Sequence, residues 1–179
     1  MRSGIPHPTL AHMTSRIPDP DIRIRLATLT DVAALAHHRV NMFRDMGELP
    51  RHLEAELTDA SESFLRRTIA AGEYVAWVAV TREDPERVVA GAGLWLRSAL
   101  PRPMPTGIDQ GREALVANVY TEPDWRRRGI AALLMRQVLD YTREHRILRV
   151  RLHASDEGRR LYESLGFAPS NEMKLVLPI

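Results

Sequence analysis

The stretch WRRRGIAALLM, residues 125–135, decides the fold because it places three arginines and a glycine directly before an apolar run. The run from Ile130 to Met135 is typical of the buried face of a helix. The first backbone N–H groups of a helix have no partner within the helix, and the helix dipole adds partial positive charge there. Three interpretations follow: a solvated helix start, a nucleic-acid patch, or a socket for a phosphate-bearing small molecule.

The composition restricts the class of protein. The chain has 179 residues, of which 44% are hydrophobic and 27% charged, and this length suits one well-buried core. The net charge is only +2, with a modest basic bias in the C-terminal third that falls short of a polyanion-binding stripe. Lys174 is the one lysine, so the other basic residues are arginines, which suit bidentate contacts to phosphate.

Several classes of protein are excluded by what the sequence lacks. Cysteine is absent, which excludes disulfides, thiolate metal sites and a cysteine nucleophile. No apolar stretch approaches the roughly 18 residues of a membrane span. The first 20 residues are interrupted by prolines and have no continuous apolar segment, so they predict a disordered arm, residues 1–20, rather than a secretory signal. A cytoplasmic location is expected.

The hydrophobic pattern predicts alternating strands and helices. Residues 21–28 alternate as a half-buried strand, and a helix over 31–47 follows, with Thr30 as its cap and Asp31 in its first turn. One face of this helix carries Val32, Leu35, Ala36, Phe43 and Met46. The later elements are a helical region at 50–72, either continuous or broken, and a hairpin of strands 74–84 and 87–100. A strand at 114–121, a helix after Gly129, a strand at 147–155, a helix at 156–166 and a last strand at 171–178 follow.

The order of these elements predicts the fold class. The order β-α-α-β-β-β-α-β-α-β indicates one α/β (or α+β) domain over residues 21–179, and the strand–helix–strand step at 114–154 predicts a right-handed crossover with parallel pairing. Segment 101–113 is rich in proline and glycine. Because it is too long for a plain connector, we expect a functional or mobile loop there.

The glycine at the mouth of the helix favours capture of an anion. Gly129 and Ala131 leave no bulk between the backbone and a diphosphate, and the flanking arginines add charge and donors. No Gly-Lys-Ser/Thr follows, so the stretch is not a Walker loop, and it also lacks the Gly-x-Gly-x-x-Gly pattern of dinucleotide-binding domains. Taken alone, the short motif does not separate a diphosphate socket from a basic helix start.

A second motif, LHASDEGRRLYESLGF at residues 152–167, lies downstream. Together with Arg126-x-x-Gly129-x-Ala131 it resembles the GNAT superfamily of acyl-CoA-dependent N-acyltransferases, closely over 114–167 and loosely in the upstream element order. The resemblance implies a mixed central sheet of about six to seven strands flanked by helices, with acetyl-CoA as co-substrate. It implies an amine-bearing small molecule or peptide as acceptor, and no nucleic acid or membrane partner. A homodimer paired through the last strands is one option.

The resemblance also implies which residues contact acyl-CoA. The strand at 114–121 would splay from its neighbour, its backbone would bond the pantetheine arm, and amides at the helix mouth would hold the pyrophosphate. Arg159 and Arg160 would approach the nucleotide end or form a solvated helix face. The residues implied to bind acyl-CoA are Val119, Tyr120, Thr121, Arg126, Arg127, Arg128, Gly129, Ile130, Ala131 and Ser155.

Tyr162 is implied as the catalytic hydroxyl that donates a proton to the departing CoA thiolate. The alternative for this residue is a tyrosine that packs beside its neighbouring leucines. The resemblance does not assign the general base. Glu113, Glu122 and Glu172 are candidates, and each is otherwise an exposed carboxylate. We favour Glu172, because the final hairpin borders the acceptor site in this family, or water relayed by backbone carbonyls.

The acceptor is expected to meet the first helix pair and the 101–113 loop. Arg39, Phe43 and Asp45 are the candidate substrate residues, and the alternative is a core stripe beside a solvated side of the helix. His37 and His38 lack the i, i+4 spacing of a helical metal pair, so no metal is predicted. A non-catalytic acyl-CoA sensor on the same fold is the second functional hypothesis. Nucleic-acid binding is the third, and it lacks an aromatic platform beside the arginines.

Overall fold

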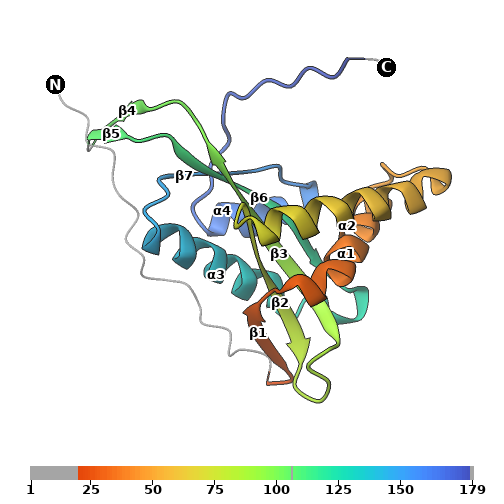
Figure 1. The fold of residues 1–179 in the computed structure, drawn as a ribbon. Coiled ribbons are helices and arrows are strands. Elements are labelled where there is room, and N and C mark those ends of the chain that lie inside the picture. Colours follow the sequence, from red (N-terminus) through yellow and green to blue (C-terminus); the bar gives the residue numbers. More distant parts are fainter. Residues whose placement is uncertain (1–19, 106, 178–179) are drawn as a thin grey trace.

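A five-stranded mixed sheet forms the centre of the fold (Figure 1). The structure is a computed structural model that describes residues 20–105 and 107–177. In the order in which they lie side by side, the strands are β1 (Ile22–Leu26), β2 (Tyr74–Thr81), β3 (Val88–Ser98), β6 (Arg112–Thr121) and β7 (Arg149–Leu152). Each strand is antiparallel to its neighbour, except that β6 and β7 are parallel.

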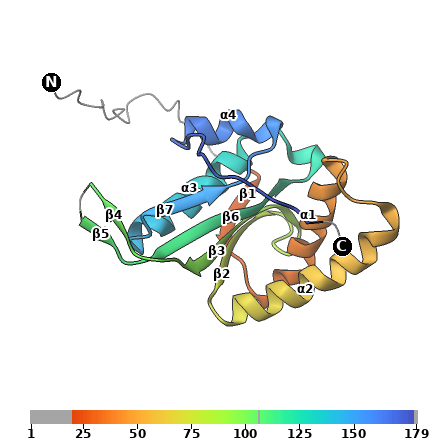
Figure 2. The ribbon, with the colours of Figure 1, turned by 90° about the horizontal axis from the view of Figure 1, so that it is seen from above.

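Helices cover both faces of this sheet, as the view from above shows (Figure 2). On one face lie α1 and α2, and on the other lie α3 and α4. The helices are α1 (Val32–Asp45), α2 (Glu54–Ala70), α3 (Ile130–Glu144) and α4 (Asp156–Ser164), with short 3₁₀ turns at Leu29–Asp31, Arg51–Leu53 and Pro123–Trp125. Each face has its own apolar cluster of buried side chains, so the sheet is covered on both sides.

The opening stretch forms α3 as predicted, and the reason is local. Gly129 takes a left-handed conformation, with φ of +83°, and ends the turn that leads into the helix. Ile130, Leu134 and Val138 then fall on one face at intervals of four residues, and all three are buried against the sheet. Their burial fixes the N-terminus of α3 close to the end of β6, where the candidate site begins.

The predicted fold class is confirmed, and so is the parallel pairing on either side of α3. The second helical region begins with the 3₁₀ turn Arg51–Leu53, which runs directly into α2, so the region is continuous rather than broken. The distribution of strands differs from the expected single sheet of about six to seven. Among the described residues, five strands form the central sheet, and two more form a separate small sheet.

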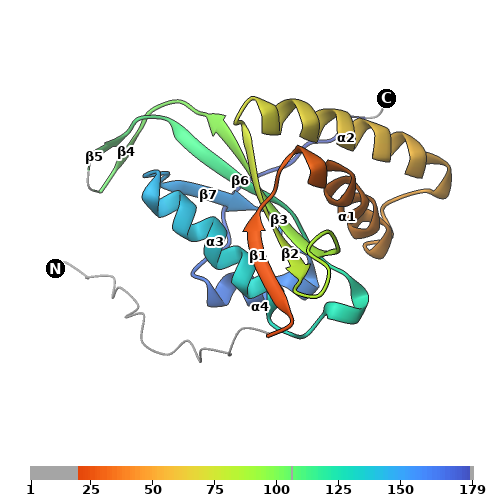
Figure 3. The same ribbon diagram turned by 60° about the horizontal axis from the view of Figure 1, so that its bottom comes forward.

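This small sheet replaces the loop predicted at 101–113. It consists of β4 (Arg102–Met104) and β5 (Gly107–Asp109), and the hairpin projects from the end of the central sheet (Figure 3). A buried ion pair holds its base: the Asp109 Oδ2 atom lies 2.6 Å from Nε of Arg149 on β7. The segment is therefore a short β-hairpin. Its prolines and glycines favour a loop when the sequence is considered alone.

The strand predicted at 171–178 is wrong for the residues that the structure describes there. Residues 165–177 form no strand, and Met173 and Leu175 are 95% and 83% exposed. Alternating apolar residues become a strand only when a sheet edge accepts their hydrogen bonds. Here the segment crosses the fold without a ladder to β7, the strand at the edge of the central sheet.

The cap predicted at Thr30 is also wrong: Asp31 holds the N-cap position of α1, and Thr28 caps the 3₁₀ turn that precedes it. Thr28 accepts a hydrogen bond from the Thr30 amide, and the Asp31 carboxylate bonds the Thr28 amide, which makes a capping box around a 3₁₀ turn. Asp31 is held in place by the Arg25 guanidinium, with N–O distances of 2.7 and 2.8 Å. Of the predicted apolar face of α1, Met46 is exposed rather than buried.

The predicted arm, residues 1–20, lies outside the described residues apart from its last position, so the arm and the domain boundary stay predictions. Within residues 20–105 and 107–177, no helix combines the length and the apolar character needed to cross a membrane.

The buried His38 on α1 gives the fold a pH dependence that a substitution tests. Its side chain is 1% exposed, and burial, with a smaller contribution from His37, lowers its pKa to about 4, although Glu122 Oε1 lies 3.4 Å from Nε2. The unfolded chain therefore binds this proton more readily, and stability is lost as the pH falls from 6.5 toward 4. The unfolding free energy should decrease between about pH 7 and about pH 4.5 in both proteins. We expect this decrease to be about 2 kcal/mol smaller in His38→Leu than in the wild type.

Urea unfolding of both proteins at the two pH values measures this difference. The exposed His52 provides the control, because His52→Leu makes the same substitution without removing a buried ring. Equal pH dependence in the wild type and in His38→Leu would contradict the prediction, whatever the overall stability of the variant.

Candidate active site

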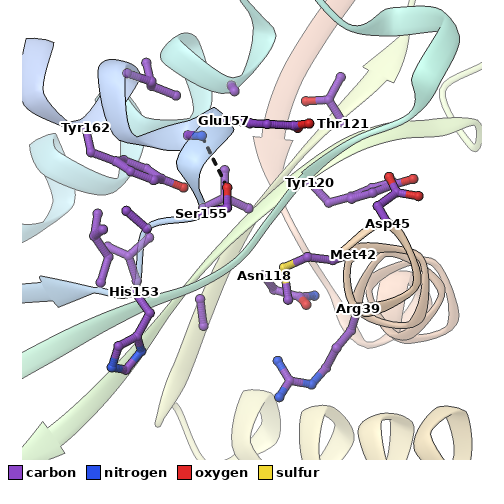
Figure 4. Close-up of a pocket in the computed structure, with 18 of the residues that line it drawn as sticks. Arg39, Met42, Asp45, Asn118, Tyr120, Thr121, His153, Ser155, Glu157 and Tyr162 are labelled. Atoms are coloured by element: carbon purple, nitrogen blue, oxygen red, sulfur yellow. Dashed lines mark hydrogen bonds between the residues drawn. The ribbon is translucent and has the colours of Figure 1, made fainter. Parts of the chain in front are cut away.

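A cleft opens where the two parallel strands separate (Figure 4). The pairing of β6 with β7 ends at Val116 and Leu152, so beyond this pair the backbone of β6 has no strand on that side. A bulge reinforces the separation. Between the pairs Gly93–Ala117 and Gly91–Tyr120 the register shifts, and Asn118 takes a φ of +59°. A bulge bends its strand away from the ladder, and here it turns β6 away from the chain that continues β7.

The mouth of α3 lies beside this opening and can hold an anion. The turn before the helix contains two left-handed residues, Arg127 with φ of +65° and Gly129 with φ of +83°. Among the residues that the structure describes, no side chain forms a capping hydrogen bond at Gly129, the N-cap of the helix. The N–H groups of its first turn have no acceptor within the helix, and the dipole adds partial positive charge. Ala131 and Ala132 line the cleft and add no bulk beyond a methyl group. A diphosphate suits these donors.

The three arginines of the motif differ in their surroundings. The Arg126 side chain turns away from the helix mouth: it pairs with Asp45 of α1, donates to the Thr121 carbonyl at 2.9 Å and approaches the Tyr120 hydroxyl at 3.3 Å. The bond to Asp45 raises the pKa of the Arg126 guanidinium further above its usual value. The Arg128 guanidinium lies 4.5 Å from the centre of the Trp125 ring. Arg126 therefore links the turn to α1.

Tyr162 enters the cleft from α4 and faces β6 (Figure 4). It is 9% exposed, and burial raises the pKa of its hydroxyl, so the hydroxyl stays protonated at neutral pH. Gly158 fixes the ring position, because a Cβ at that residue would lie 2.9 Å from the Tyr162 ring. Phe167 packs against the other side, edge to face, with 6.1 Å between the ring centres. The Tyr162 ring is therefore packed on both sides, and its protonated hydroxyl faces the opening.

Ser155 lines the same cleft and also begins α4. Its Oγ atom accepts a hydrogen bond from the Gly158 amide at 3.2 Å, as an N-cap does. Val119 and Thr121 lie beyond the point where β6 stops pairing with β7, and Tyr120 between them is 7% exposed. The residues predicted to contact acyl-CoA thus all line this one cleft.

The three carboxylates considered as general base do not line the cleft. Glu113 lies 2.9 Å from Arg97 and 3.2 Å from Arg151, and Glu172 lies 3.4 Å from the same Arg151. Glu122 faces the two histidines of α1. Glu113 and Glu172 are thus paired with arginines, and all three carboxylates lie outside the opening.

The predicted acceptor residues do lie together, on the α1 wall of the cleft. Arg39, Phe43 and Asp45 line it, and the Arg39 guanidinium lies 4.9 Å from the centre of the Phe43 ring. Sequence reasoning missed Asn118, His153 and Glu157 as cleft residues. The signal for Asn118 was available, since a single asparagine within an apolar strand is typical of a left-handed bulge residue. Across the part of the chain that the structure describes, no group of three or more His, Asp or Glu side chains is arranged to hold a metal ion.

This fold and cleft define a class of protein, and comparison with known proteins identifies it. The chain belongs to the acetyltransferase (GNAT) family, whose model matches residues 34–167. The family assigns the chain to the transferases, and it confirms the resemblance inferred from the two motifs. A comparison with curated proteins finds no match.

Solved structures of acetyltransferases share the fold. A GCN5-related N-acetyltransferase from Ralstonia eutropha JMP134 is 29% identical over 87% of this chain and 98% of that chain, with a TM-score of 0.76. A predicted acetyltransferase from Clostridium acetobutylicum, solved with acetyl-CoA, is 27% identical over 87% and 96%, with a TM-score of 0.72. Glucosamine-6-phosphate N-acetyltransferase from Arabidopsis thaliana, at 12% identity over 87% and 97% and a TM-score of 0.62, shows the fold alone.

Proposed function

We propose that the protein transfers an acetyl or other short acyl group from acyl-CoA to a primary amine by direct attack in a ternary complex. One observation carries the proposal: the unpaired edge of β6 beyond Val116 and the uncapped N-terminus of α3 open into the same cleft. The strand edge offers backbone groups to a pantetheine arm, and the helix mouth offers amides to a pyrophosphate. The similar structure solved with acetyl-CoA supports the choice of donor.

The proposed reaction has one bond-making step. The amine nitrogen attacks the thioester carbonyl carbon, whose oxygen is polarised by backbone N–H groups of β6. The C–N bond forms and the C–S bond breaks, so the products are an amide and the CoA thiolate. Tyr162 donates its proton to that thiolate and regains one from solvent. The proton lost by the amine leaves through water along the β6 carbonyls, because the three candidate carboxylates do not line the cleft.

This route predicts the behaviour of Glu172, the carboxylate favoured from the sequence. Because its carboxylate is exposed and pairs with Arg151, we expect Glu172→Gln to leave the pH dependence of kcat/KM unchanged within experimental error. A rate profile for acyl transfer over about pH 6 to about pH 9 measures this. The loss of the acidic limb of the profile would reinstate Glu172 as the base.

A non-catalytic acyl-CoA sensor is the second candidate, and the position of Glu113, Glu122 and Glu172 outside the cleft favours it. The two functions differ in a direct assay. Acetyl-CoA is incubated with a panel of primary amines, and free thiol is followed. An enzyme releases thiol in proportion to amine and protein, whereas a sensor binds acetyl-CoA in calorimetry without amine-dependent release.

A further inference from the structure

The acceptor end of the cleft has a distinct chemical character. The acceptor end is the part of the cleft lined by Arg39, Met42 and Phe43 of α1, Phe64 of α2, Trp95 of β3 and Asn118 of β6. It lies across the cleft from Tyr162, with Asn118 on β6 between α4 and α1 (Figure 4). Its side chains therefore meet whatever attacks the thioester, and they limit the chemistry of that molecule.

Arg39 supplies a positive charge at this end. Its side chain is half-buried, and among the ion pairs between described residues none includes it. Two neighbouring arginines are neutralised: Arg126 pairs with Asp45, and Arg44 pairs with Glu54 at 2.8 Å. A partly desolvated guanidinium gains most from a carboxylate, which it binds through two parallel hydrogen bonds.

Two buried polar groups of the cleft lack a partner among the described residues. Asn118 is 4% exposed, and its Nδ2 donates to the Leu35 carbonyl at 2.8 Å, but its Oδ1 accepts no hydrogen bond. Ser61 of α2, which also lines the cleft, is 5% exposed, and its Oγ atom has no partner. An unsatisfied buried acceptor is costly. The N–H groups of an amine would satisfy the Asn118 oxygen at the bulge, beside the predicted position of the thioester.

The remaining wall of the acceptor end is apolar and aromatic. Phe64 and Trp95 meet edge to face, with 5.6 Å between their ring centres, and Phe43 lies under the Arg39 guanidinium. Such a surface binds a hydrocarbon or aromatic group. A polycationic amine fits less well, because it would meet the charge of Arg39. The carboxylates of this wall are Asp45, which is paired with Arg126, and the exposed Glu48.

We propose that the acceptor is an amino acid with a large apolar side chain, whose carboxylate binds Arg39 and whose amine faces Asn118. The inference rests on the proposed acyl transfer and names its substrate class. The apolar side chain would lie against Phe43, Phe64 and Trp95. Polyamines and aminoglycosides, which lack a carboxylate, would be poor substrates.

Matched amines test the proposal. L-phenylalanine is compared with 2-phenylethylamine, and L-leucine with 3-methylbutylamine, so that each pair differs in the carboxylate alone. β- and γ-amino acids with apolar side chains extend the panel to other spacings. We expect kcat/KM for the best carboxylate-bearing member to exceed that of its decarboxylated partner about thirtyfold, and Arg39→Met to remove this preference. Arg39→Lys should restore part of it, since the charge remains without the planar fork.

A control variant on α1 distinguishes the loss of a positive charge inside the cleft from the loss of a positive charge elsewhere on the same helix. Arg44→Met removes an arginine that is paired with Glu54 and does not line the cleft, so the preference for carboxylates should persist. Equal turnover of the matched amines, or an unchanged preference in Arg39→Met, would overturn the inference while acyl transfer still stood.

Calorimetry with the same amino acids, in the presence of saturating CoA, provides a readout that does not need turnover. Binding in the wild type that weakens about thirtyfold in Arg39→Met supports the inference even if no acyl transfer is seen. If no member of the panel binds, the inference fails. Binding of CoA itself by that protein would then leave the donor half of the proposed function intact.

Discussion

Replacement of Gly129 by glutamate is expected to weaken coenzyme A binding about a hundredfold or more. The residue forms the left-handed turn at the mouth of α3, with φ of +83°. A carboxylate placed there faces the diphosphate, and two unit charges about 4 Å apart near a protein surface repel by about 4 kcal/mol. About 2.7 kcal/mol of this is sufficient for a hundredfold loss. Isothermal titration of CoA into the wild type and the variant measures the ratio.

A matched variant controls for backbone strain. Gly72 follows α2 with φ of +69°, and a Cβ there meets no atom within 4 Å. Gly72→Glu therefore introduces the same charge at the same kind of left-handed position, away from the cleft. We expect it to lower the melting temperature about as much as Gly129→Glu and to leave CoA affinity unchanged. If both variants bound CoA as the wild type does, the helix mouth would not be the diphosphate site.

Removal of the Tyr162 hydroxyl is expected to lower kcat about a hundredfold, because a positioned proton donor contributes roughly 10²- to 10⁴-fold to a rate. Tyr162→Phe keeps the ring, which packs against Phe167, so the fold and the affinity for acyl-CoA should hold within about twofold. Burial raises the pKa of this hydroxyl above its ordinary value of 10.0. Below pH 10.0 the hydroxyl should therefore stay protonated, and its ionisation should not lower kcat.

Steady-state kinetics with acetyl-CoA and titration of CoA separate these two effects. Tyr141→Phe is the control, since this tyrosine lies on α3, stacks on His145 with 3.8 Å between the ring centres, and does not line the cleft. It should leave kcat unchanged. A Tyr162→Phe enzyme with wild-type kcat would show that the thiolate leaves without help from this hydroxyl and that Tyr162 is a packing residue.

The turn into α3 could be predicted because its causes are adjacent in the chain. Gly129 and the apolar spacing from Ile130 lie within a few residues of each other, and the structure places both as expected. The direction of the Arg126 side chain could not be predicted, because its partner Asp45 is 81 positions away. The same applies to the buried base of the β4–β5 hairpin, where Asp109 meets Arg149 from 40 positions away.

Two other differences arise from choices among similar local signals. Thr28 and Thr30 both suit a helix cap, and the ion pair between Arg25 and Asp31 decides in favour of the first. The alternation in 171–177 suits a strand, but a strand needs an edge that pairs with it, and periodicity carries no information about edges. In the site itself, Glu172 is favoured from the sequence because the final hairpin borders the acceptor site in the family, but in this chain the described part of that segment forms no strand and Glu172 pairs with Arg151.

The hydrogen bond from Asn118 to the Leu35 carbonyl joins the floor of the cleft to its α1 wall. Asparagine tolerates the left-handed backbone of the bulge, and its amide reaches the helix because of that geometry. A shift of α1 along its axis must therefore either stretch this bond or carry the strand with it. Helix and strand form one mechanical unit, so a molecule that displaces α1 would also change the spacing of the backbone amides on the opposite side of the strand.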